Sequence, residues 1–462
     1  MDKIKKNERF VLEITDINNL GFGVGRHKGL VVFVANSAVG DIIEAKCVKV
    51  TSSYAVAICE KLTVPSPMRT DEGCTHRGCG GCAYQHISYD EEKRLKESYV
   101  RHAFIKAGVD AKIMPITSND KTRGYRNKAE YPIAKGKNGY IIGFYAPKSH
   151  RVVECADCSL QPSIFSEIVE WLRAEFGRLS LSVYDEESGK GLLRHIYLRR
   201  ASTGDIALTL VVTAQFDGQA SLCERVCARF PEIKNFALNI NPEKTNVICS
   251  DRYINLFGEG YITDALAGVR LNISPASFYQ VNHSMTELLY AKARELASLK
   301  KGDVLCDLFC GIGSIGLSMA KDCGRLVGIE IIEDAVRCAE DNARQNGIEN
   351  AEFFAGDASD AERFFGSVST PDGSPFSPDV ILLDPPRKGC TPTLIEYIAK
   401  TLKTDRVVYI SCNPDTLARD ARLFADLGYS VGEVFPFDLF PRTGHVESVV
   451  SLTRGFDVDM RR

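Results

Sequence analysis

Apolar and polar residues alternate in short runs over the first sixty positions of the chain. The runs RFVLEITDI, GLVVFVA, DIIEAKCVKV and SYAVAICEKL are separated by polar or glycine-rich turns such as NNLGFGVGRHKG. Alternation with a period of two is typical of strands, so these runs predict a small antiparallel β-barrel over residues 1–62. Such barrels often bind oligonucleotides, although a packing or solubility module would show the same pattern. The following stretch LTVPSPMRTDEG, with two prolines and a glycine, predicts a linker.

The pattern between residues 63 and 268 is less regular. It opens with a group of cysteines and continues with a helix expected from Tyr89 to Ala107. The later runs KAEYPIA, GYIIGFYA, HIYLRRA and IALTLVVTA are rich in β-branched and aromatic residues, which is typical of strands. The helix and the strands together predict a central α+β domain.

From residue 269 to residue 462, apolar runs alternate with amphipathic segments. VLCDLF, RLVGIEI, DVILLDPP and RVVYIS indicate buried strands, whereas DAVRCAEDNARQNG and TLARDARLFADLG have the spacing of helices. This βαβα alternation predicts a doubly wound, Rossmann-like α/β domain with a mostly parallel sheet. The last two strand-like runs, GEVFPFDLF and HVESVVSLT, are expected to form an antiparallel hairpin at the edge of that sheet.

Length and composition limit the class of protein. A chain of 462 residues is too long for one core, and 44% hydrophobic with 25% charged residues is typical of a soluble globular protein. No uncharged apolar run approaches the roughly 18 residues that a membrane helix needs, and MDKIKKNERF lacks the apolar segment of a leader. We therefore expect several domains in a cytoplasmic protein without a membrane partner.

Sixteen cysteines are too many to explain by disulfides in that compartment, where thiols stay reduced. Metal binding, catalysis and core packing must share them. Five cysteines in apolar surroundings are expected to be core residues: Cys47, Cys59, Cys223, Cys227 and Cys249.

The net charge of −3 gives no global field that would attract nucleic acid. Between residues 121 and 151, however, eight basic residues accompany one acid, Glu130, and alternate with Tyr125, Tyr131 and Tyr140. Basic residues neutralise phosphates and aromatic rings stack on bases, so this segment is a candidate nucleic-acid surface; a merely solvated face is the simpler alternative. The basic residues are Lys121, Arg123, Arg126, Lys128, Lys135, Lys137, Lys148 and Arg151.

The first strand-to-helix turn of the C-terminal domain carries a glycine-rich loop, DLFCGIGSIGL. Its glycines allow a tight turn and the close approach of a nucleotide, as in NAD and FAD sites. Glu330 ends the next strand, where a carboxylate can accept hydrogen bonds from a ribose, and Asp357 follows the third strand, placed to reach an adenine amine. The loop lacks the lysine of a P-loop, and Asp307 suits a positively charged amino-acid group better than a pyrophosphate. These features favour S-adenosylmethionine over NAD, with a turn kept for packing as the alternative.

Two further motifs end neighbouring strands of the same domain. DPPRKGC places Asp384 after the fourth strand, and YISCNP places Cys412 after the fifth. Ligands of an open α/β sheet bind beyond the carboxyl ends of its strands, so both residues should face the cofactor crevice. Cys412 is then either a buried core thiol or a nucleophile.

Together, DLFCGIGSIGL, DPPRKG, SCNP and the late GHVES resemble the S-adenosylmethionine-dependent RNA 5-methyluridine methyltransferases, which modify uracil C5 in 23S rRNA and tRNA. The resemblance covers nearly the whole chain, because the N-terminal barrel looks like the TRAM domain of the ribosomal branch. It implies a 23S rRNA (uracil-C5)-methyltransferase that uses S-adenosylmethionine as its cofactor.

The resemblance also implies roles for single residues. Cys412 matches the nucleophile that adds to C6 of uracil, and Glu447 matches the base that removes the proton from C5. Without the resemblance, Glu447 would be a surface carboxylate on an edge strand. The positions that match the cofactor-binding residues of the family are Gln280, Phe309, Glu330 and Asp384.

The cysteines near residue 80 have the spacing of metal ligands. CTHRGCGGC contains Cys74, Cys79 and Cys82, and ECADCSLQP contains Cys155 and Cys158. Four thiolates can bind zinc or an iron-sulfur cluster, and the spacing barely separates the two. The ribosomal branch holds a [4Fe-4S] cluster with three such cysteines and a fourth before Leu-Gln, which implies Cys158 here. The first gap is one residue shorter than is usual there, which leaves Cys155 as an alternative ligand.

Three other functions compete with this interpretation. A tRNA uridine methyltransferase would use the same chemistry, but the barrel and the cysteines argue against it. An RNA 5-methylcytosine enzyme would place its cysteine directly after the DPP motif, where this chain has Arg387. An inactive iron-sulfur RNA-binding protein would not need both Cys412 and Glu447. We expect the chain to act as a monomer on RNA and not on DNA.

Overall fold

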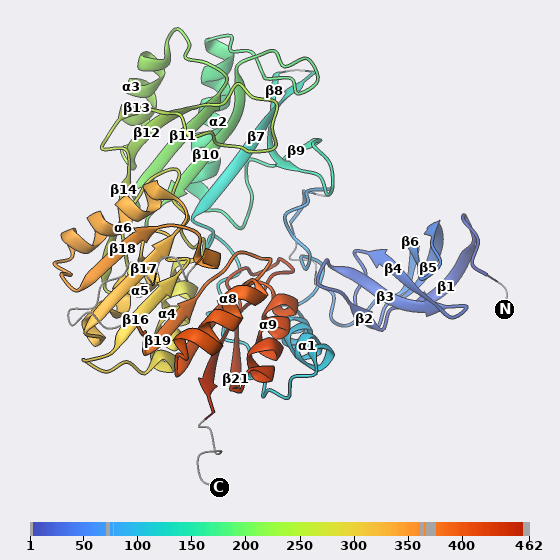
Figure 1. Cartoon of the computed structure of the whole chain (residues 1–462). Coiled ribbons are helices and arrows are strands. Elements are labelled where there is room, and N and C mark those ends of the chain that lie inside the picture. Colours follow the sequence, from blue (N-terminus) through green and yellow to red (C-terminus); the bar gives the residue numbers. More distant parts are fainter. Residues whose placement is uncertain are drawn as a thin grey trace.

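The N-terminal barrel projects from two larger bodies (Figure 1). A computed structural model describes residues 3–70, 74–76, 78–137, 139–360, 365 and 376–455. The barrel confirms the expected small β domain, with Leu12, Val34 and Ile43 in its core. Its strand order is β1-β5-β6-β4-β3-β2, and the one departure from an antiparallel pattern is the parallel pair of β4 and β6. The strands are β1 (Arg9–Glu13), β2 (Asp16–Ile17), β3 (Phe22–His27), β4 (Leu30–Ala35), β5 (Ile42–Val50) and β6 (Tyr54–Val64).

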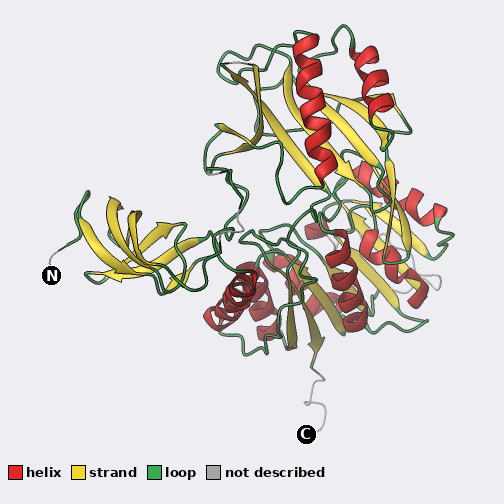
Figure 2. Cartoon of the chain, turned by 180° about the vertical axis from the view of Figure 1, so that it is seen from behind, coloured by secondary structure: helices red, strands yellow, loops and turns green. Residues whose placement is uncertain are grey.

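The central body is a seven-stranded sheet with the order β13-β12-β11-β10-β7-β8-β9. Two helices cover one of its faces (Figure 2), and their apolar residues share a core with those of β7, β10, β11 and β12. This arrangement confirms the predicted α+β class. The elements are β7 (Lys128–Gly136), β8 (Gly139–Tyr145), β9 (Val152–Glu154), α2 (Ser163–Arg178), β10 (Leu193–Arg200), β11 (Ile206–Val212), α3 (Gln219–Arg229), β12 (Ile233–Ile240) and β13 (Tyr253–Phe257).

The tyrosines of the basic segment do not form a stacking surface, so that part of the expectation is wrong. Tyr131 is fully buried in the central core. Tyr125 is also buried, and its hydroxyl donates to the carbonyl of Pro441 at 2.9 Å. Tyr140 packs edge-on against Phe176 and donates to main-chain carbonyls. On strands that are half covered by helices, the aromatic side chains fill the core while most of the basic ones stay at the surface.

The C-terminal body is the predicted doubly wound domain. Its sheet has the order β18-β17-β16-β19-β20-β22-β21, and β22 runs antiparallel to both of its neighbours. The parallel pairs from β18 to β20 bury almost continuous apolar runs on both faces. The strands are β16 (Val304–Leu308), β17 (Arg325–Glu330), β18 (Ala351–Ala355), β19 (Val380–Leu383), β20 (Arg406–Ser411), β21 (Tyr429–Phe437) and β22 (Glu447–Arg454).

Helices pack on both faces of this sheet. One core unites the sheet with α4, α5 and α6, and the hairpin of β14 and β15 packs against α6 on that side. The other core unites it with α8 and α9. The elements are β14 (Ile262–Leu266), β15 (Val269–Ile273), α4 (His283–Ala297), α5 (Ser314–Met319), α6 (Glu333–Gln345), α8 (Pro392–Glu396) and α9 (Pro414–Asp426).

Helix α1 (Tyr89–Ala107) belongs by its packing to the C-terminal body, although the sequence placed it in the central domain. Ser88 caps its N-terminus, and Gly108, with φ at 70°, ends it. Val100 and Phe104 join the core formed with α8 and α9, and α1 lies beside α9 (Figure 1). The segment after it continues beside β21, where the N–H of Thr117 donates to Pro436. Residues 63–268 therefore do not pack as one unit, because α1 belongs to the C-terminal core.

The cysteines outside the predicted sites differ in their burial. Cys47 and Cys223 are buried as expected, and Cys227 and Cys249 are partly buried. Cys59 is exposed, because the outer half of β6 runs beyond the barrel core, so the prediction that it packs inside is wrong. Among the residues that the structure describes, no helix is long and apolar enough to cross a membrane.

Candidate active site

Cys412 and Glu447 meet at one end of two adjacent strands. Cys412 follows the last residue of β20, and Glu447 is the first residue of β22. The ladder pairs Ser411 with Ser448, so the next residues outward, Cys412 and Glu447, face each other across the two strands. Glu447 is 2% exposed, whereas Cys412 remains partly accessible. The sheet therefore brings a reachable thiol and a buried carboxyl group together at its carboxyl edge.

The groups around Cys412 keep its thiol protonated in the free protein. Burial raises the pKa of its thiol to about 11; Glu447 and Asp384 contribute to this rise, and Arg387 opposes it. Asp384 follows the adjacent strand β19, and loss of solvent raises its pKa to about 7. Burial and the charge of Asp384 raise the pKa of Glu447 well above its usual value. Three groups that carry negative charge when ionised thus lie close enough to influence one another and the guanidinium of Arg387.

The DPPRKG loop is fastened to the start of α9. The side-chain amide of Asn413 donates to the carbonyl of Arg387 at 3.0 Å, and the hydroxyl of Thr416 donates to the same oxygen at 3.3 Å. Gly389 adopts φ of +75°, and a Cβ there would lie 2.5 Å from a carboxylate oxygen of Asp420. The loop that carries Asp384 and Arg387 is therefore held directly against the residue after Cys412.

The glycine-rich loop forms the predicted turn between β16 and α5. The N–H of Gly311 donates to Glu330 Oε2 at 3.0 Å, and the N–H of Ile332 donates to Oε1 at 3.0 Å. Asp307 is buried, and one of its carboxylate oxygens accepts the N–H of Gly316 at 2.9 Å while the other has no partner. Burial raises the pKa of Asp307 to about 8. An unpaired buried carboxylate oxygen at this turn suits a ligand with donor groups or positive charge.

The other predicted cofactor residues lie around this turn. Phe309 directly follows β16 with φ of 69°, a strained value for a residue other than glycine. Gln280 is 7% exposed in the segment between β15 and α4. Asp357 lies in the exposed turn after β18 and accepts the N–H of Ser359 at 2.8 Å. Phe309, Glu330, Asp357 and Asp384 thus lie at or just beyond the carboxyl ends of four adjacent parallel strands.

The cysteines predicted to bind a metal line one cavity of about 980 Å³. The cavity also reaches Arg387 and His445 beside the active site, and Arg126 and Lys128 of the central domain. Its cysteines are Cys74, Cys79, Cys82, Cys155 and Cys158. Residues that are far apart in the sequence are thus brought together, as the resemblance implied.

Each of the four predicted ligands accepts a hydrogen bond from nitrogen. The N–H of His76 lies 3.4 Å from the sulfur of Cys74, and the N–H of Gly81 lies 3.4 Å from that of Cys79. The amide of Gln85 reaches Cys82 at 3.4 Å. A hydrogen bond from the Cys155 thiol, with donors at Leu160 and Gln161, lowers the pKa of Cys158 to about 7. Burial raises the pKa of the other three thiols, so the nitrogen donors at their sulfurs, and not a lowered pKa, are what fits a sulfur-bound metal or cluster.

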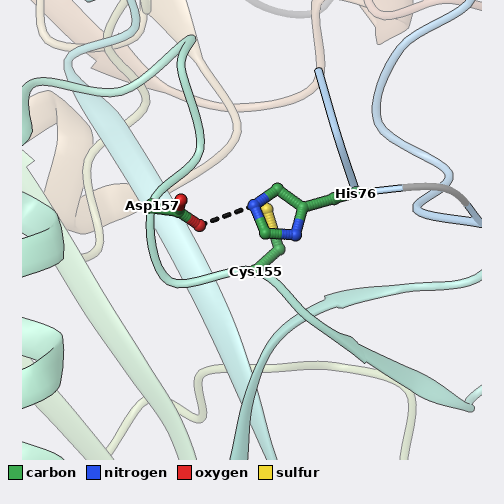
Figure 3. Close-up of side chains that lie close together, drawn as sticks. All are labelled: His76, Cys155 and Asp157. Carbon is green, nitrogen blue, oxygen red and sulfur yellow. Dashed lines mark ion pairs between the residues drawn. The ribbon is translucent and has the colours of Figure 1, made fainter.

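Cys155 lies in a second, tighter group. Its sulfur, the Nε2 atom of His76 and a carboxylate oxygen of Asp157 lie close enough together to hold a single ion, and His76 pairs with Asp157 at 2.6 Å (Figure 3). Cys155 is 1% exposed and also contacts Cys158. The structure thus gives Cys155 two sets of neighbours. His76 and Asp157 were missed, although both lie inside the quoted motifs, because only the cysteines of those motifs were considered as ligands.

The sequence also gave no indication of a buried ionic network behind the active site. The Nζ atom of Lys96 donates to Glu92 and to Asp438 at 2.8 Å each, and these three side chains are at most 1% exposed. Lys96 also donates to the carbonyl of Phe440 at 3.1 Å, and the N–H of Arg442 donates to Glu92 at 2.7 Å. The network anchors the loop between β21 and β22, residues 438–446, which leads directly into Glu447.

Comparisons with known proteins agree with this geometry. An uncharacterized RNA methyltransferase of Halalkalibacterium halodurans is 36% identical over 97% of this chain and 98% of its own length. One of Clostridium tetani is 35% identical over 97% of both chains. The crystal structure of Pyrococcus abyssi tRNA (uracil-54, C5)-methyltransferase in complex with S-adenosyl-L-homocysteine is 26% identical, with a TM-score of 0.75 over 96% of this chain and 99% of that one.

Two family models match the chain in sequence. Residues 5–58 match the TRAM domain, which confirms the resemblance of the barrel. Residues 89–455 match the model described as tRNA (Uracil-5-)-methyltransferase, and this match begins at α1 and ends after β22. The second match covers far more than half of the chain, which therefore belongs to the tRNA (uracil-5-)-methyltransferase family and carries a TRAM domain at its N-terminus.

Proposed function

We propose that this protein methylates C5 of a uridine in RNA with S-adenosylmethionine as the methyl donor. The observation that carries the proposal is the pairing of Cys412 with Glu447 at the edge of the sheet, next to Asp384 and the glycine-rich turn. When bound, the cofactor supplies an electrophilic methyl group. Gln280, Phe309, Glu330, Asp357 and Asp384 would hold it.

The residues at this end of the sheet can make C5 of uracil nucleophilic. C5 of uracil is a weak nucleophile, and addition of the Cys412 thiolate to C6 forms a C–S bond while the ring electrons move toward C5. C5 then takes the methyl group and is left with both the methyl group and a proton. Glu447 removes that proton, the electrons reform the C5–C6 double bond, and the C–S bond breaks to release Cys412. The target base must leave its stack, because C6 is inaccessible within one.

The substrate that we propose is 23S rRNA. The arrangement of the cysteines around one cavity supports it, since the resemblance to the ribosomal branch rests on them. The barrel does not separate the two branches, because the similarity to the P. abyssi tRNA enzyme extends over 96% of this chain. That similarity makes tRNA the second candidate substrate. The expectation that the barrel argues against a tRNA substrate is therefore wrong.

We further propose that Cys74, Cys79, Cys82 and Cys158 hold a [4Fe-4S] cluster. The nitrogen donors at their sulfurs support thiolate ligands, and Cys155 is the alternative fourth ligand. A cluster would be structural, clamping the basic segment of residues 121–151 onto the RNA path. Anaerobically purified protein should contain iron and inorganic sulfide and absorb broadly in the visible range. A colourless protein that contains zinc would contradict the cluster.

The reaction is tested with labelled cofactor on transcripts of 23S rRNA fragments and of tRNA. The wild-type protein should label an rRNA fragment at a uridine, whereas the Glu447→Gln variant should accumulate a denaturation-resistant adduct with the same RNA. Labelling of tRNA alone would assign the chain to the second candidate substrate. Absence of labelling in any RNA, with the cofactor bound, would contradict the proposed activity.

A further inference from the structure

Arg387 carries a positive charge close to the proposed nucleophile. Its guanidinium opposes the rise in the pKa of Cys412 and also that of Glu447. Cys412, Glu447 and Asp384 repel one another's negative charge in this pocket, and a cation against the sulfur offsets that repulsion. The direction of the Arg387 side chain therefore decides how readily the thiolate forms.

The main chain of Arg387 is fixed, but its side chain needs a separate support. Asn413 and Thr416 hold its carbonyl, as described above. The support for the guanidinium is His445, whose Nε2 atom lies 3.1 Å from Nη2 of Arg387 across 58 residues of sequence. A guanidinium has only donors, so Nε2 must accept, and the imidazole must be neutral with its proton on Nδ1.

His445 is itself held in place. The hydroxyl oxygen of Thr443 accepts its main-chain N–H at 3.3 Å, and its ring packs edge-on against Phe440 at 5.9 Å between centroids. Lys96 binds the carbonyl of Phe440, which ties this loop to the buried network on α1. Loss of solvent, and then the charges of Arg387, Lys96 and Arg126, lower the pKa of His445 to about 4. The imidazole thus stays an acceptor throughout the neutral range.

We propose that His445 is a positioning residue whose neutral imidazole holds the guanidinium of Arg387 against the sulfur of Cys412, so that the thiolate can form in the free enzyme. The proposal deepens the proposed function, since it takes Cys412 as the nucleophile. The property it concerns is the reactivity of a single thiol, which can be measured without RNA or cofactor.

The test is the rate at which iodoacetamide alkylates Cys412, followed by mass spectrometry of its peptide. Exposed Cys59 in the barrel serves as the reference within the same molecule. The variants are Arg387→Met, His445→Phe, which lacks an acceptor, and His445→Gln, whose amide oxygen can replace Nε2. At pH 8, Arg387→Met and His445→Phe should slow the alkylation of Cys412 by about three- to tenfold, and His445→Gln should slow it by less than about twofold. The alkylation rate of Cys59 should be unchanged in all three variants.

A pH profile separates ionisation from simple access to the thiol. If Arg387 and His445 act through the charge at Cys412, with Glu447 and Asp384 as the opposing groups, the midpoint of the profile moves up by about 0.5–1 pH unit in both variants. The profile must extend past the pKa of about 11, because below it a raised pKa and a loss of access both lower the rate by the same factor at every pH. Above it, a raised pKa leaves the plateau rate unchanged, whereas a loss of access lowers the plateau. Unchanged alkylation in His445→Phe, with Arg387→Met slowed, would overturn the role of His445, and unchanged alkylation in both would overturn the whole proposal.

This result is distinguishable from a failure of the proposed function. If Cys412→Ala still methylated RNA, Cys412 would not be the nucleophile, whatever the alkylation rates show. If the proposal holds, His445→Phe should lower kcat by about tenfold with the KM for RNA nearly unchanged, and His445→Gln should recover most of the loss. A loss confined to KM would place His445 in RNA binding and contradict its positioning role.

Discussion

Cys412 and Cys158 have the same side chain in opposite electrostatic surroundings. At Cys412, burial and two carboxyl groups raise the thiol pKa to about 11. At Cys158, a thiol donor and two main-chain N–H groups lower it to about 7. The first sulfur keeps its proton at neutral pH in the free protein, although Arg387 is close, whereas the second ionises near neutral pH, as the proposed metal ligand must. The neighbours, and not the type of residue, separate a catalytic cysteine from a structural one.

The two sulfur sites are physically joined. The main-chain N–H groups of Ala83 and Tyr84, which directly follow Cys82, donate to the carbonyl of Arg442 at 2.9 and 3.1 Å. Arg442 lies in the loop 438–446 that carries His445 and ends at Glu447. Lys96 holds the same loop from α1. A change at the cysteine cavity can therefore reach the active site through one short segment.

The largest expected difference is between Cys412→Ala and Cys82→Ala. Cys412→Ala should lower methyl transfer by at least about 10³-fold, because the addition to C6 is lost, with cofactor affinity retained and the melting temperature within about 2 °C of wild type. Cys82→Ala should instead lower metal content and melting temperature, with a smaller loss of activity per folded molecule. Calorimetry, metal analysis and label transfer measure these quantities. If both variants lost methyl transfer, metal content and melting temperature to the same extent, the two sites would not be functionally distinct.

The link between the sites can be weakened at Lys96. Lys96→Met should reduce the free energy of unfolding by about 3–5 kcal/mol at pH 8, because Glu92 and Asp438 lose their buried partner. The pKa of Glu92 is raised to about 7, first by burial, so Glu92 can take up a proton below that pH and the loss should be smaller at pH 5.5. Urea denaturation at both pH values tests this effect.

Lys93 on the same helix gives the matched control for Lys96. Its side chain pairs with exposed Asp90 and Asp120 at the surface. Lys93→Met should therefore change the free energy of unfolding by less than about 1 kcal/mol. Similar effects of the two substitutions would show that the buried network does not anchor the loop.

The pH dependence of Cys412 alkylation tests the electrostatic description of the proposed nucleophile. Since its pKa is raised to about 11, the thiol is protonated at neutral pH and the thiolate fraction grows with pH. Alkylation of Cys412 in the free protein should rise about tenfold per pH unit from pH 7 to 9, without a plateau below about pH 10. A plateau near pH 7 would show a thiolate that is already formed and would contradict the electrostatic account.

The smallest effect is expected at a sulfur that belongs to neither site. Cys59 is exposed on the barrel, so Cys59→Ser should change the free energy of unfolding by less than about 0.5 kcal/mol. Metal content and methyl transfer should also be unchanged. A marked loss of either would mean that a third cysteine environment matters.

The strand ends of the active site could be predicted because the βαβα pattern fixes where they lie. Apolar runs located β19, β20 and β22. The parallel order of β19 and β20 places Asp384 and Cys412 at one end of the sheet, and the antiparallel β22 begins at that same end with Glu447. The strand ends needed only local pattern and topology. The grouping of Cys158 with Cys74, Cys79 and Cys82 was instead implied by the resemblance to the family.

Other features depend on contacts that a pattern cannot specify. Helix α1 has an apolar face, but its sequence does not say which body that face packs against. Glu92 and Lys96 have the i,i+4 spacing of a common surface pair, yet both are buried. His445 and Arg387 lie in separate loops that meet only in the folded chain. The histidine two residues before Glu447 was the one available signal, and it does not identify a partner.

The most direct test of the central claim is to map the adduct formed by Glu447→Gln with RNA and S-adenosylmethionine. Nuclease and protease digestion followed by mass spectrometry would identify the cysteine that carries the nucleotide. The account predicts one modified peptide, with a methylated uridine attached to Cys412. An adduct on another cysteine, or rapid methylation without any covalent intermediate, would contradict it.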